Sequence, residues 1–367
     1  MRRISSKIDK ANRRFDILNS ITGLRAGAAI AVVIYHILSA MGFYDAKDSV
    51  ALGAAGVDIF FVISGFIMMY VSFERFRTPR ASWRFLKDRF IRIAPMYYLF
   101  TFLTLLILLF APTLYGELRF SPSQTISSFL FVLSDNNLGH PGMLVGVGWT
   151  LAFEAFFYVV FACLLCLPRS FALPVLAIVF GGGFIAGQVW EIDAPWAMVV
   201  TNPLTFEFLL GCWLGWAVRE KLRMPSRAAL ALLIVGITGL LGAAHFGLLE
   251  SDWSNARPIV FGIPAAAIVA GAVFIEQNRH VPMPVPVAKV GVSSYSLYLG
   301  HQYVIAALVA VLWPHIPKTA PGLGAFFVAV LLACLVFGWL CYRFIEEPIT
   351  RQLKRGERTR SPKVSAG

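Results

Sequence analysis

Charged side chains are scarce in this chain. Asp, Glu, Lys and Arg make up 14% of the 367 residues, hydrophobic residues make up 58%, and the mean hydropathy is +0.71. A water-soluble domain needs far more charge to cover its surface. The composition therefore excludes an ordinary soluble enzyme and indicates one membrane domain.

Cysteines are also few, and all five lie in apolar segments. Cys163 and Cys166 form a C-x-x-C pair, but a zinc or redox site there would lack polar neighbours, so packing is the better interpretation. No metal site is predicted. The first 16 residues are polar and basic, and the long apolar run after them contains Arg25, unlike a cleavable signal peptide. We expect the amino terminus to stay attached.

The chain contains many long apolar runs. A helix needs about 20 apolar residues to cross the hydrocarbon layer, and only helices satisfy the backbone of these segments in lipid. Such runs lie near 20–42, 52–72, 93–111, 148–167, 172–190, 201–218, 228–247, 256–276, 290–313 and 322–345. The sequence predicts an all-α, polytopic membrane protein with about ten transmembrane helices.

Lysine and arginine are distributed very unevenly between the connections. Of 32 such residues, 27 fall on the side of the amino terminus, and four (Lys47, Arg119, Arg257 and Lys318) fall on the other side. Cytoplasmic segments carry the excess of basic residues, so both termini are predicted to be cytoplasmic. This distribution also explains the net charge of +12 better than nucleic-acid binding, and no nucleic-acid partner is expected.

This topology divides the chain into three parts. They are a basic cytoplasmic segment at 1–16, a membrane domain at 17–347 and a basic cytoplasmic tail at 348–367. The longest external connection, at 112–147, is rich in Pro, Ser and Asn. A connection of this length is usually functional or mobile.

Two ionisable residues share the first span. Arg25 and His36 are eleven positions apart, which returns them to one helix face at depths that differ by roughly 16 Å. Arg25 would lie near the cytoplasmic side and His36 toward the outer leaflet. Ionisable groups in the bilayer are functional candidates. The alternatives are a snorkelling arginine and a structural, hydrogen-bonded histidine.

Three carboxylates lie about six residues into spans that run inward. Asp58, Glu154 and Glu207 would each sit roughly 9 Å below the outer face, near the depth of His36. Together these groups could handle protons. The alternative is a carboxylate that bonds a helix terminus or a loop. We favour this alternative for Glu207 and a functional role for Asp58 and Glu154.

Other candidates line the same predicted cleft. His301 lies near the middle of the ninth span beside Tyr295 and Tyr298. Two roles are equally compatible with this position: His301 lines a polar cavity, or it makes a structural hydrogen bond. The predicted cytoplasmic loop at 73–92 carries Arg89 and Arg92. Arginine suits phosphate recognition, although such a loop also binds anionic lipid.

Six motifs, in order along the chain, carry a resemblance to a known family. They are LNSITGLRAGAAIAVVIYH at 18–36, GVDIFFVISGF at 56–66, RFIRIAPMYY at 89–98, WTLAFEAFFY at 149–158, GVSSYSLYLGH at 291–301 and FIEEP at 344–348. Together they resemble the acyltransferase-3 family of membrane O-acyltransferases, whose first helix carries a basic residue, ten residues and then histidine. WTLAFEAFFY and the IPAAA stretch at 263–267 are most similar to the branch that acetylates exopolysaccharides.

The resemblance implies a function and a set of partners. The donor would be cytoplasmic acyl-CoA, acetyl-CoA by default, and the acceptor a hydroxyl of an exported polysaccharide or of its lipid-linked precursor. The implied setting is the bacterial inner membrane with its lipids, and polysaccharide-assembly proteins are further partners. Arg25, Arg89 and Arg92 would bind the donor phosphates, with Tyr295 and His301 lining the donor site.

The remaining candidates would carry the chemistry. His36 would act as a general base on the acceptor hydroxyl or accept the acyl group transiently. Asp58 or Glu154 would orient the imidazole ring or the sugar. The rival hypothesis is a transporter of a sugar or glycan intermediate, because charges inside the membrane also mark transport pathways.

Overall fold

The structure is a computed structural model that describes residues 18–43, 51–115, 118–190, 192, 194–248 and 254–360. Within these ranges, ten helical segments are long and apolar enough to cross a membrane. Each overlaps one of the ten predicted spans, so the predicted all-α, polytopic architecture is confirmed. The predicted amino-terminal segment at 1–16 lies outside the described residues.

The main helices follow one another with short connections. The long ones are α2 (Asn19–Ala40), α3 (Ala51–Ser72), α4 (Ala81–Phe110), α6 (Trp149–Leu164), α7 (Ala172–Val189), α9 (Thr205–Arg219), α10 (Ser226–His245), α11 (Ile263–Asn278), α12 (Val285–Leu312) and α13 (Ala320–Cys341). The shorter ones are α5 (Pro122–Phe129), α8 (Pro195–Thr201) and α14 (Glu347–Arg360), together with 3₁₀ turns η1 (Pro112–Tyr115), η2 (Gly146–Gly148), η3 (Arg169–Phe171) and η5 (Trp313–His315). Two π-helical turns, η4 (Pro258–Gly262) and η6 (Tyr342–Glu346), lead into α11 and α14.

One predicted boundary is wrong. Helix α4 begins at Ala81 and continues through Pro95, so Arg89 and Arg92 lie on a helix and not in a loop. The apolar run begins only at 93, because basic side chains interrupt it before that point. Arginine and lysine are good helix formers, and a helix that leaves the hydrocarbon layer does not need to stay apolar.

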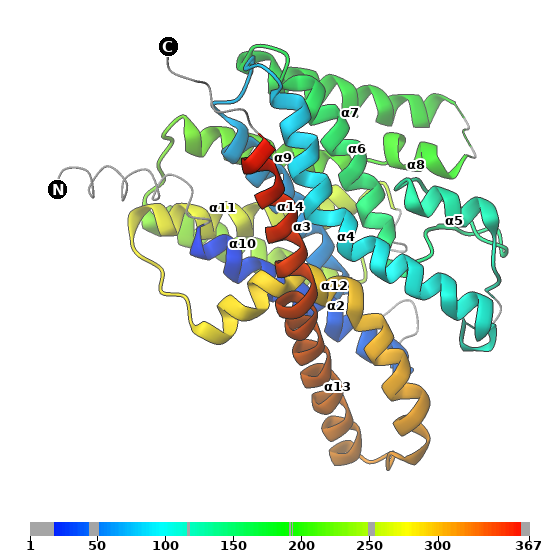
Figure 1. Cartoon of the computed structure of the whole chain (residues 1–367). Coiled ribbons are helices and arrows are strands. Elements are labelled where there is room, and N and C mark those ends of the chain that lie inside the picture. Colours follow the sequence, from blue (N-terminus) through cyan, green and yellow to red (C-terminus); the bar gives the residue numbers. More distant parts are fainter. Residues whose placement is uncertain are drawn as a thin grey trace.

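Helices α2, α3 and α12 form the centre of the bundle. Helix α2 packs against α3 and α12, α3 packs against α9, and α12 packs against α13. In Figure 1, α12 and α4 separate toward their carboxyl-terminal ends, and α13 runs beside α12. This arrangement places the face of α12 that meets α2 in the interior.

Helices α3 and α9 approach each other through Gly65, Gly211 and Gly215, of which the first two make the tightest contacts. A Cβ atom added at Gly65 would lie 2.1 Å from the carbonyl oxygen of Phe208, and one added at Gly211 would lie 2.1 Å from that of Val62. Small residues at helix interfaces allow such backbone contact in membranes. The pair therefore sets the spacing of these two helices.

The long connection between α4 and α6 is folded and packs against the middle of α4. It contains α5 and a two-stranded antiparallel sheet, β1 (Ser134–Asp135) with β2 (Pro141–Gly142). The hydroxyls of Tyr97 and Tyr98 donate to the carbonyl oxygens of Ser128 and Phe129, at 3.0 and 2.9 Å. These bonds tie the connection to the bundle.

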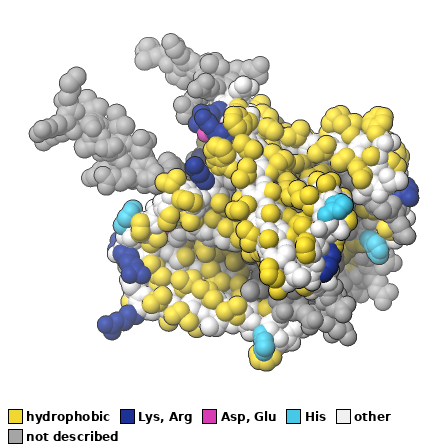
Figure 2. All heavy atoms as spheres, turned by 90° about the horizontal axis from the view of Figure 1, so that it is seen from below, with side chains coloured by type: hydrophobic (Ala, Val, Ile, Leu, Met, Phe, Trp, Pro, Cys, Tyr) yellow, Lys and Arg dark blue, Asp and Glu magenta, His cyan; other side chains and the backbone are white. Residues whose placement is uncertain are grey.

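Hydrophobic side chains dominate the surface as well as the core. Figure 2 shows them over most of the visible face, with Lys and Arg near its edges. Large apolar residues such as Ile178, Val235 and Leu332 are exposed on α7, α10 and α13. Apolar patches of this extent are expected for helices that face lipid.

Candidate active site

Arg25 and His36 lie on one continuous helix and face the same neighbour, α12. Nη2 of Arg25 donates to Oγ of Ser294 at 2.9 Å, and Nδ1 of His36 lies 3.1 Å from Nε2 of His301. Both partners belong to α12. The predicted one-face arrangement is therefore present in the structure.

A cavity of about 110 Å³, which we name the arginine cavity, surrounds Arg25. Its polar lining comes from five helices: Arg25, Ser64, Arg89, Arg92, Thr150, Glu154, Tyr158, Ser294, Tyr295 and Tyr298. The structure thus brings together five of the predicted site residues, namely Arg25, Arg89, Arg92, Glu154 and Tyr295.

The cavity carries more positive than negative charge. Three guanidinium groups and one carboxylate line it. Arg92 forms an ion pair with the buried Glu346, whose other oxygen accepts a hydrogen bond from Ser296. Nε of Arg89 is buried and has no hydrogen-bond partner among the described residues. Such an arrangement suits a ligand with phosphate groups.

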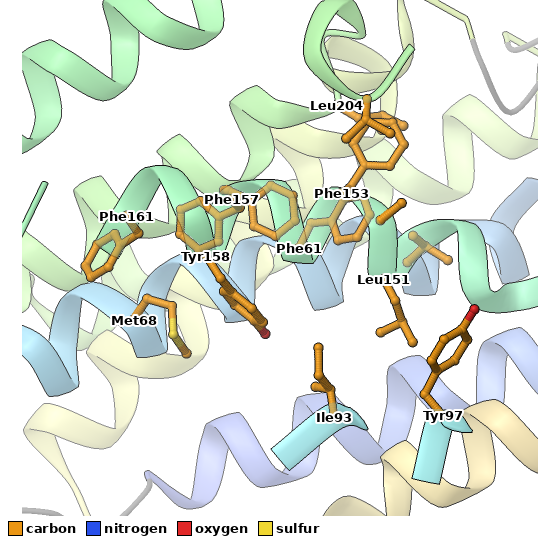
Figure 3. Packing of buried hydrophobic residues seen from close by; sticks show 14 of the residues in the cluster. Phe61, Met68, Ile93, Tyr97, Leu151, Phe153, Phe157, Tyr158, Phe161 and Leu204 are labelled. Atoms are coloured by element: carbon orange, nitrogen blue, oxygen red, sulfur yellow. The ribbon is translucent and has the colours of Figure 1, made fainter. Parts of the chain in front are cut away.

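Glu154 forms the polar wall opposite these cations. Oγ of Ser64 donates to it at 2.6 Å, and the hydroxyl of Tyr158, one turn along α6, donates at 2.9 Å. In Figure 3 the side chain of Tyr158 points away from Phe153, Phe157 and Phe161, and its hydroxyl is directed toward Ile93. The phenylalanines pack the far side of α6, so the polar positions of this helix turn into the cavity.

Asp58 has different partners from Glu154. Its two carboxylate oxygens accept hydrogen bonds from Nε and Nη2 of Arg257, at 3.0 and 2.9 Å, and both side chains are fully buried. Arg257, predicted to lie in an external loop, therefore lies inside the bundle, and the ring of Trp149 lies 6.0 Å from its guanidinium. Asp58 does not line the arginine cavity.

Glu207 lies in the first turn of α9, and its side chain is buried against Gly262. Neither of its carboxylate oxygens has a hydrogen-bond partner among the described residues, so the predicted bond to a helix terminus or a loop is not seen there. The four groups predicted at one depth therefore have separate surroundings. Glu154 bonds Ser64 and Tyr158, His36 contacts His301, and Asp58 pairs with Arg257, whereas the oxygens of Glu207 have no hydrogen-bond partner in the part of the chain that the structure describes.

The histidine pair has a defined hydrogen-bond direction. Nδ1 of His301 lies 3.1 Å from the carbonyl oxygen of Leu297, which can only accept. In a neutral imidazole this contact leaves a lone pair on Nε2 of His301, so the contact with His36 requires a proton on Nδ1 of His36. That proton is shared with the carbonyl oxygen of Val32 at 2.9 Å. Nε2 of His36 is then the basic nitrogen.

A second and larger space lies beyond the histidines. This α4–α12 groove, of about 650 Å³, is bounded by the last turns of α4, by the connection at 118–146 and by α12 from Gln302 to Ala310. The hydroxyls of Thr150 and Tyr298, which line the arginine cavity, are 3.1 Å apart. Their neighbours Trp149 and Gln302 line the groove, so this contact lies where the two spaces approach each other.

Several residues of the site were not predicted. Ser64, Tyr158 and Glu346 fall inside quoted motifs, but serine, tyrosine and a carboxylate near a helix end carry no pattern of their own. Arg257 pairs with a residue 199 positions away. Only the ionisable groups inside long apolar runs gave a signal strong enough to single them out.

The fold and the site together define a multi-pass membrane protein with a cationic cavity lined from five helices and, on two of these helices, a contacting pair of histidines, of which His301 is buried and His36 half-buried. A family model described as an acyltransferase domain matches residues 18–343. The chain therefore belongs to the acyltransferase-3 family and is a membrane acyltransferase.

Known relatives are similar over most of the chain. The exopolysaccharide production protein ExoZ of Rhizobium meliloti is 34% identical, with 86% of this chain and 93% of the relative covered. The peptidoglycan O-acetyltransferase OatA of Listeria monocytogenes is 28% identical over 90% of this chain and 56% of its own length. The acyltransferase MdmB of Streptomyces mycarofaciens is 26% identical over 92% and 93%. No solved structure matches the chain.

Proposed function

We propose that this protein transfers an acetyl group from cytoplasmic acetyl-CoA to a hydroxyl of an exported polysaccharide, or of its lipid-linked precursor, at the bacterial inner membrane. The observation that carries the proposal is the stacking of Arg25 and His36 along one helix, both turned to α12. The similarity to ExoZ and OatA supports a carbohydrate acceptor and an acetyl group.

The donor would enter at the arginine cavity. Arg25, Arg89 and Arg92 would bind its phosphates, because arginine pairs its N–H donors with phosphate oxygens. Glu154 lines the same cavity, where its carboxylate suits the amide N–H groups of the pantetheine arm. Tyr295, whose hydroxyl donates to the carbonyl oxygen of Ile93 at 2.6 Å, would shape the wall beside Arg92.

The chemistry would take place at the histidine pair. Nε2 of His36 accepts the proton of the acceptor hydroxyl while the oxygen attacks the thioester carbonyl. The carbon–sulfur bond then breaks, the acetyl ester is complete, and the thiolate of CoA takes the proton from His36. His301 contacts Nδ1 of His36 and would act as a positioning residue rather than a donor-binding one.

Asp58 would have a supporting role in this scheme. Both of its oxygens accept hydrogen bonds from Arg257, and Arg257 in turn lies under Trp149 at the edge of the α4–α12 groove. Asp58 would therefore position the aromatic wall of the acceptor side and would not touch the reacting atoms.

The distribution of basic residues supports one orientation of the protein. The segments on the side of Arg89 carry most of the lysines and arginines, which favours the cytoplasm for that side and the periplasm for the α4–α12 groove. Both termini would then be cytoplasmic, and the tail at 348–367, which includes α14, would lie there too.

Sealed proteoliposomes test this proposal. Proteoliposomes in which the protein has a single orientation are selected. Acetyl-CoA labelled in its acetyl group is enclosed on the side of Arg89, and an oligosaccharide acceptor is added on the other side. We expect label in the acceptor and free CoA on the enclosed side. Movement of the acceptor across the membrane without label transfer would instead support the transporter hypothesis.

A further inference from the structure

The α4–α12 groove has two walls of different character. The wall made by the membrane spans is aliphatic, with Leu103, Ile107 and Leu108 on α4 opposite Ala306, Ala307 and Ala310 on α12. These side chains belong to the parts of α4 and α12 that lie within candidate spans. The wall made by the connection at 118–146, which we name the polar wall, contributes Arg119, Gln124 and Asn136 among apolar residues such as Leu118 and Met143.

The aliphatic wall is open toward the surrounding lipid. Leu103 is 39% exposed, and the three alanines of α12 are also exposed. Alanine side chains are too short to fill the space between the two helices. A groove of this kind holds an apolar chain at the depth of the hydrocarbon layer, and placing a sugar there would leave its hydroxyls without partners.

The polar wall has one sign of charge. Arg119 is an exposed cation at the rim, and no Asp or Glu belongs to the described lining of the groove. Anionic phosphates complement such a rim. The connection itself is held by the hydrogen bond from the backbone N–H of Arg119 to Oδ1 of Asn137, at 2.8 Å.

The inner end of the groove is lined by the residue that follows His301 on α12. Gln302 follows His301 directly on α12 and lines the groove beside Trp149. A Cβ atom at Gly146 would lie 2.9 Å from Oε1 of Gln302. A glycine at this position therefore avoids a clash with the side-chain amide of Gln302. A sugar bound here would lie between a hydrogen-bonding amide and an aromatic ring, one residue along α12 from the partner of His36.

We propose that the α4–α12 groove binds the acceptor as a lipid-linked saccharide phosphate and not as free polymer. The prenyl or acyl chain lies between α4 and α12, the phosphate lies at Arg119, and the sugar lies at Gln302 and Trp149. This inference rests on the proposed function and selects, from the two acceptor forms named there, the membrane-bound precursor.

Binding measurements in nanodiscs test the groove without turnover. The probes are a polyprenyl diphosphate that carries one glucose and the same glucose diphosphate without the prenyl chain. We expect only the first to bind, and Ala307→Trp, which fills the groove, to weaken its binding about ten-fold or more. The matched control is Leu332→Trp on the exposed face of α13, which should bind as the wild type does. Equal binding by Ala307→Trp, or equal binding of both probes, would overturn the proposal.

A second measurement separates this inference from the proposed function. Lipid-linked repeat units are extracted from cells in which polymerisation is blocked, and their acetyl content is compared with and without this protein. Acetyl groups that depend on the protein are expected on these precursors. If acetyl groups that depend on the protein occur only on the finished polymer, the lipid-linked acceptor is contradicted. If no acetyl group depends on the protein, the proposed function is contradicted, and the binding measurement still decides whether the groove binds the lipid-linked saccharide.

Discussion

Nδ1 of His36 and Nε2 of His301 lie 3.1 Å apart on neighbouring helices that both carry further polar groups toward the arginine cavity. The contact between Nδ1 of His301 and the carbonyl oxygen of Leu297 sets the direction of the bond, since a carbonyl cannot donate. His301 and the carbonyl oxygen of Val32 thus together hold the tautomer of His36 in which Nε2 is basic. A histidine that was predicted to line the donor site is therefore better explained as the partner of the base.

Replacing His301 tests this relationship. In His301→Phe the ring keeps its bulk but cannot accept the proton of His36, and we expect kcat to fall about a hundred-fold. The KM for acetyl-CoA should stay unchanged, because His301 does not line the arginine cavity. His301→Gln, whose amide oxygen can accept, should recover part of the rate. A wild-type kcat in His301→Phe would show that His36 does not depend on this contact.

Arg89 provides a test of donor binding with a close control. Its Nε is buried at the cavity without a partner among the described residues, whereas Arg84 on the same helix is exposed and lines no part of the cavity. Loss of a charge-assisted bond to phosphate should raise the Kd for acetyl-CoA about ten-fold in Arg89→Gln. Arg84→Gln should bind as the wild type does. Equal affinity of all three proteins, measured by calorimetry, would remove Arg89 from the donor site.

The Asp58–Arg257 pair should matter first for stability. Both side chains are fully buried, so removing one partner leaves an uncompensated charge, and Arg257→Met should lower the free energy of unfolding by about 3–5 kcal/mol. The double variant Asp58→Leu/Arg257→Met removes both charges and should regain most of the loss. Thermal unfolding in detergent measures both. A double variant as unstable as the single one would mean that the pair does more than neutralise charge.

The glycines between α3 and α9 give a prediction about packing. Gly65→Ala places a methyl group against the backbone of Phe208, so the helices must move apart at a cost of about 1–3 kcal/mol. Gly182→Ala on α7 is the control, because a Cβ atom there meets no atom within 4 Å. Unfolding midpoints of the two variants should differ clearly, with Gly65→Ala the lower. Equal midpoints would show that the α3–α9 contact is adjustable.

The sequence predicts the features of this protein that depend on neighbouring positions in one helix. Arg25 and His36 could be placed on one face from their spacing, because helix periodicity is a local property. Ten spans could be counted, because the hydrocarbon thickness sets a minimum apolar length. The start of α4 could not be read in this way, since its first turns are basic and lie at the edge of the apolar run.

Contacts between side chains far apart in the chain could not be predicted from the sequence. From the sequence, Arg257 is assigned to an external segment, whereas in the structure it pairs with Asp58 in the interior. No local sequence pattern predicts a pair between residues so far apart. Depth alone grouped Glu154 with His36, whereas helix rotation decides which neighbour a side chain meets. Glu154 turns toward Ser64 and the arginine cavity, and His36 turns toward His301.

The most direct test of the account is acetyl transfer by His36→Ala, measured with labelled acetyl-CoA and a lipid-linked oligosaccharide. We expect the rate to fall by at least about a hundred-fold, as for loss of a general base, with unchanged affinity for acetyl-CoA. His245→Ala, at an exposed position near the end of α10, should transfer label at the wild-type rate. A folded His36→Ala variant that acetylates the acceptor as fast as the wild type would contradict the account.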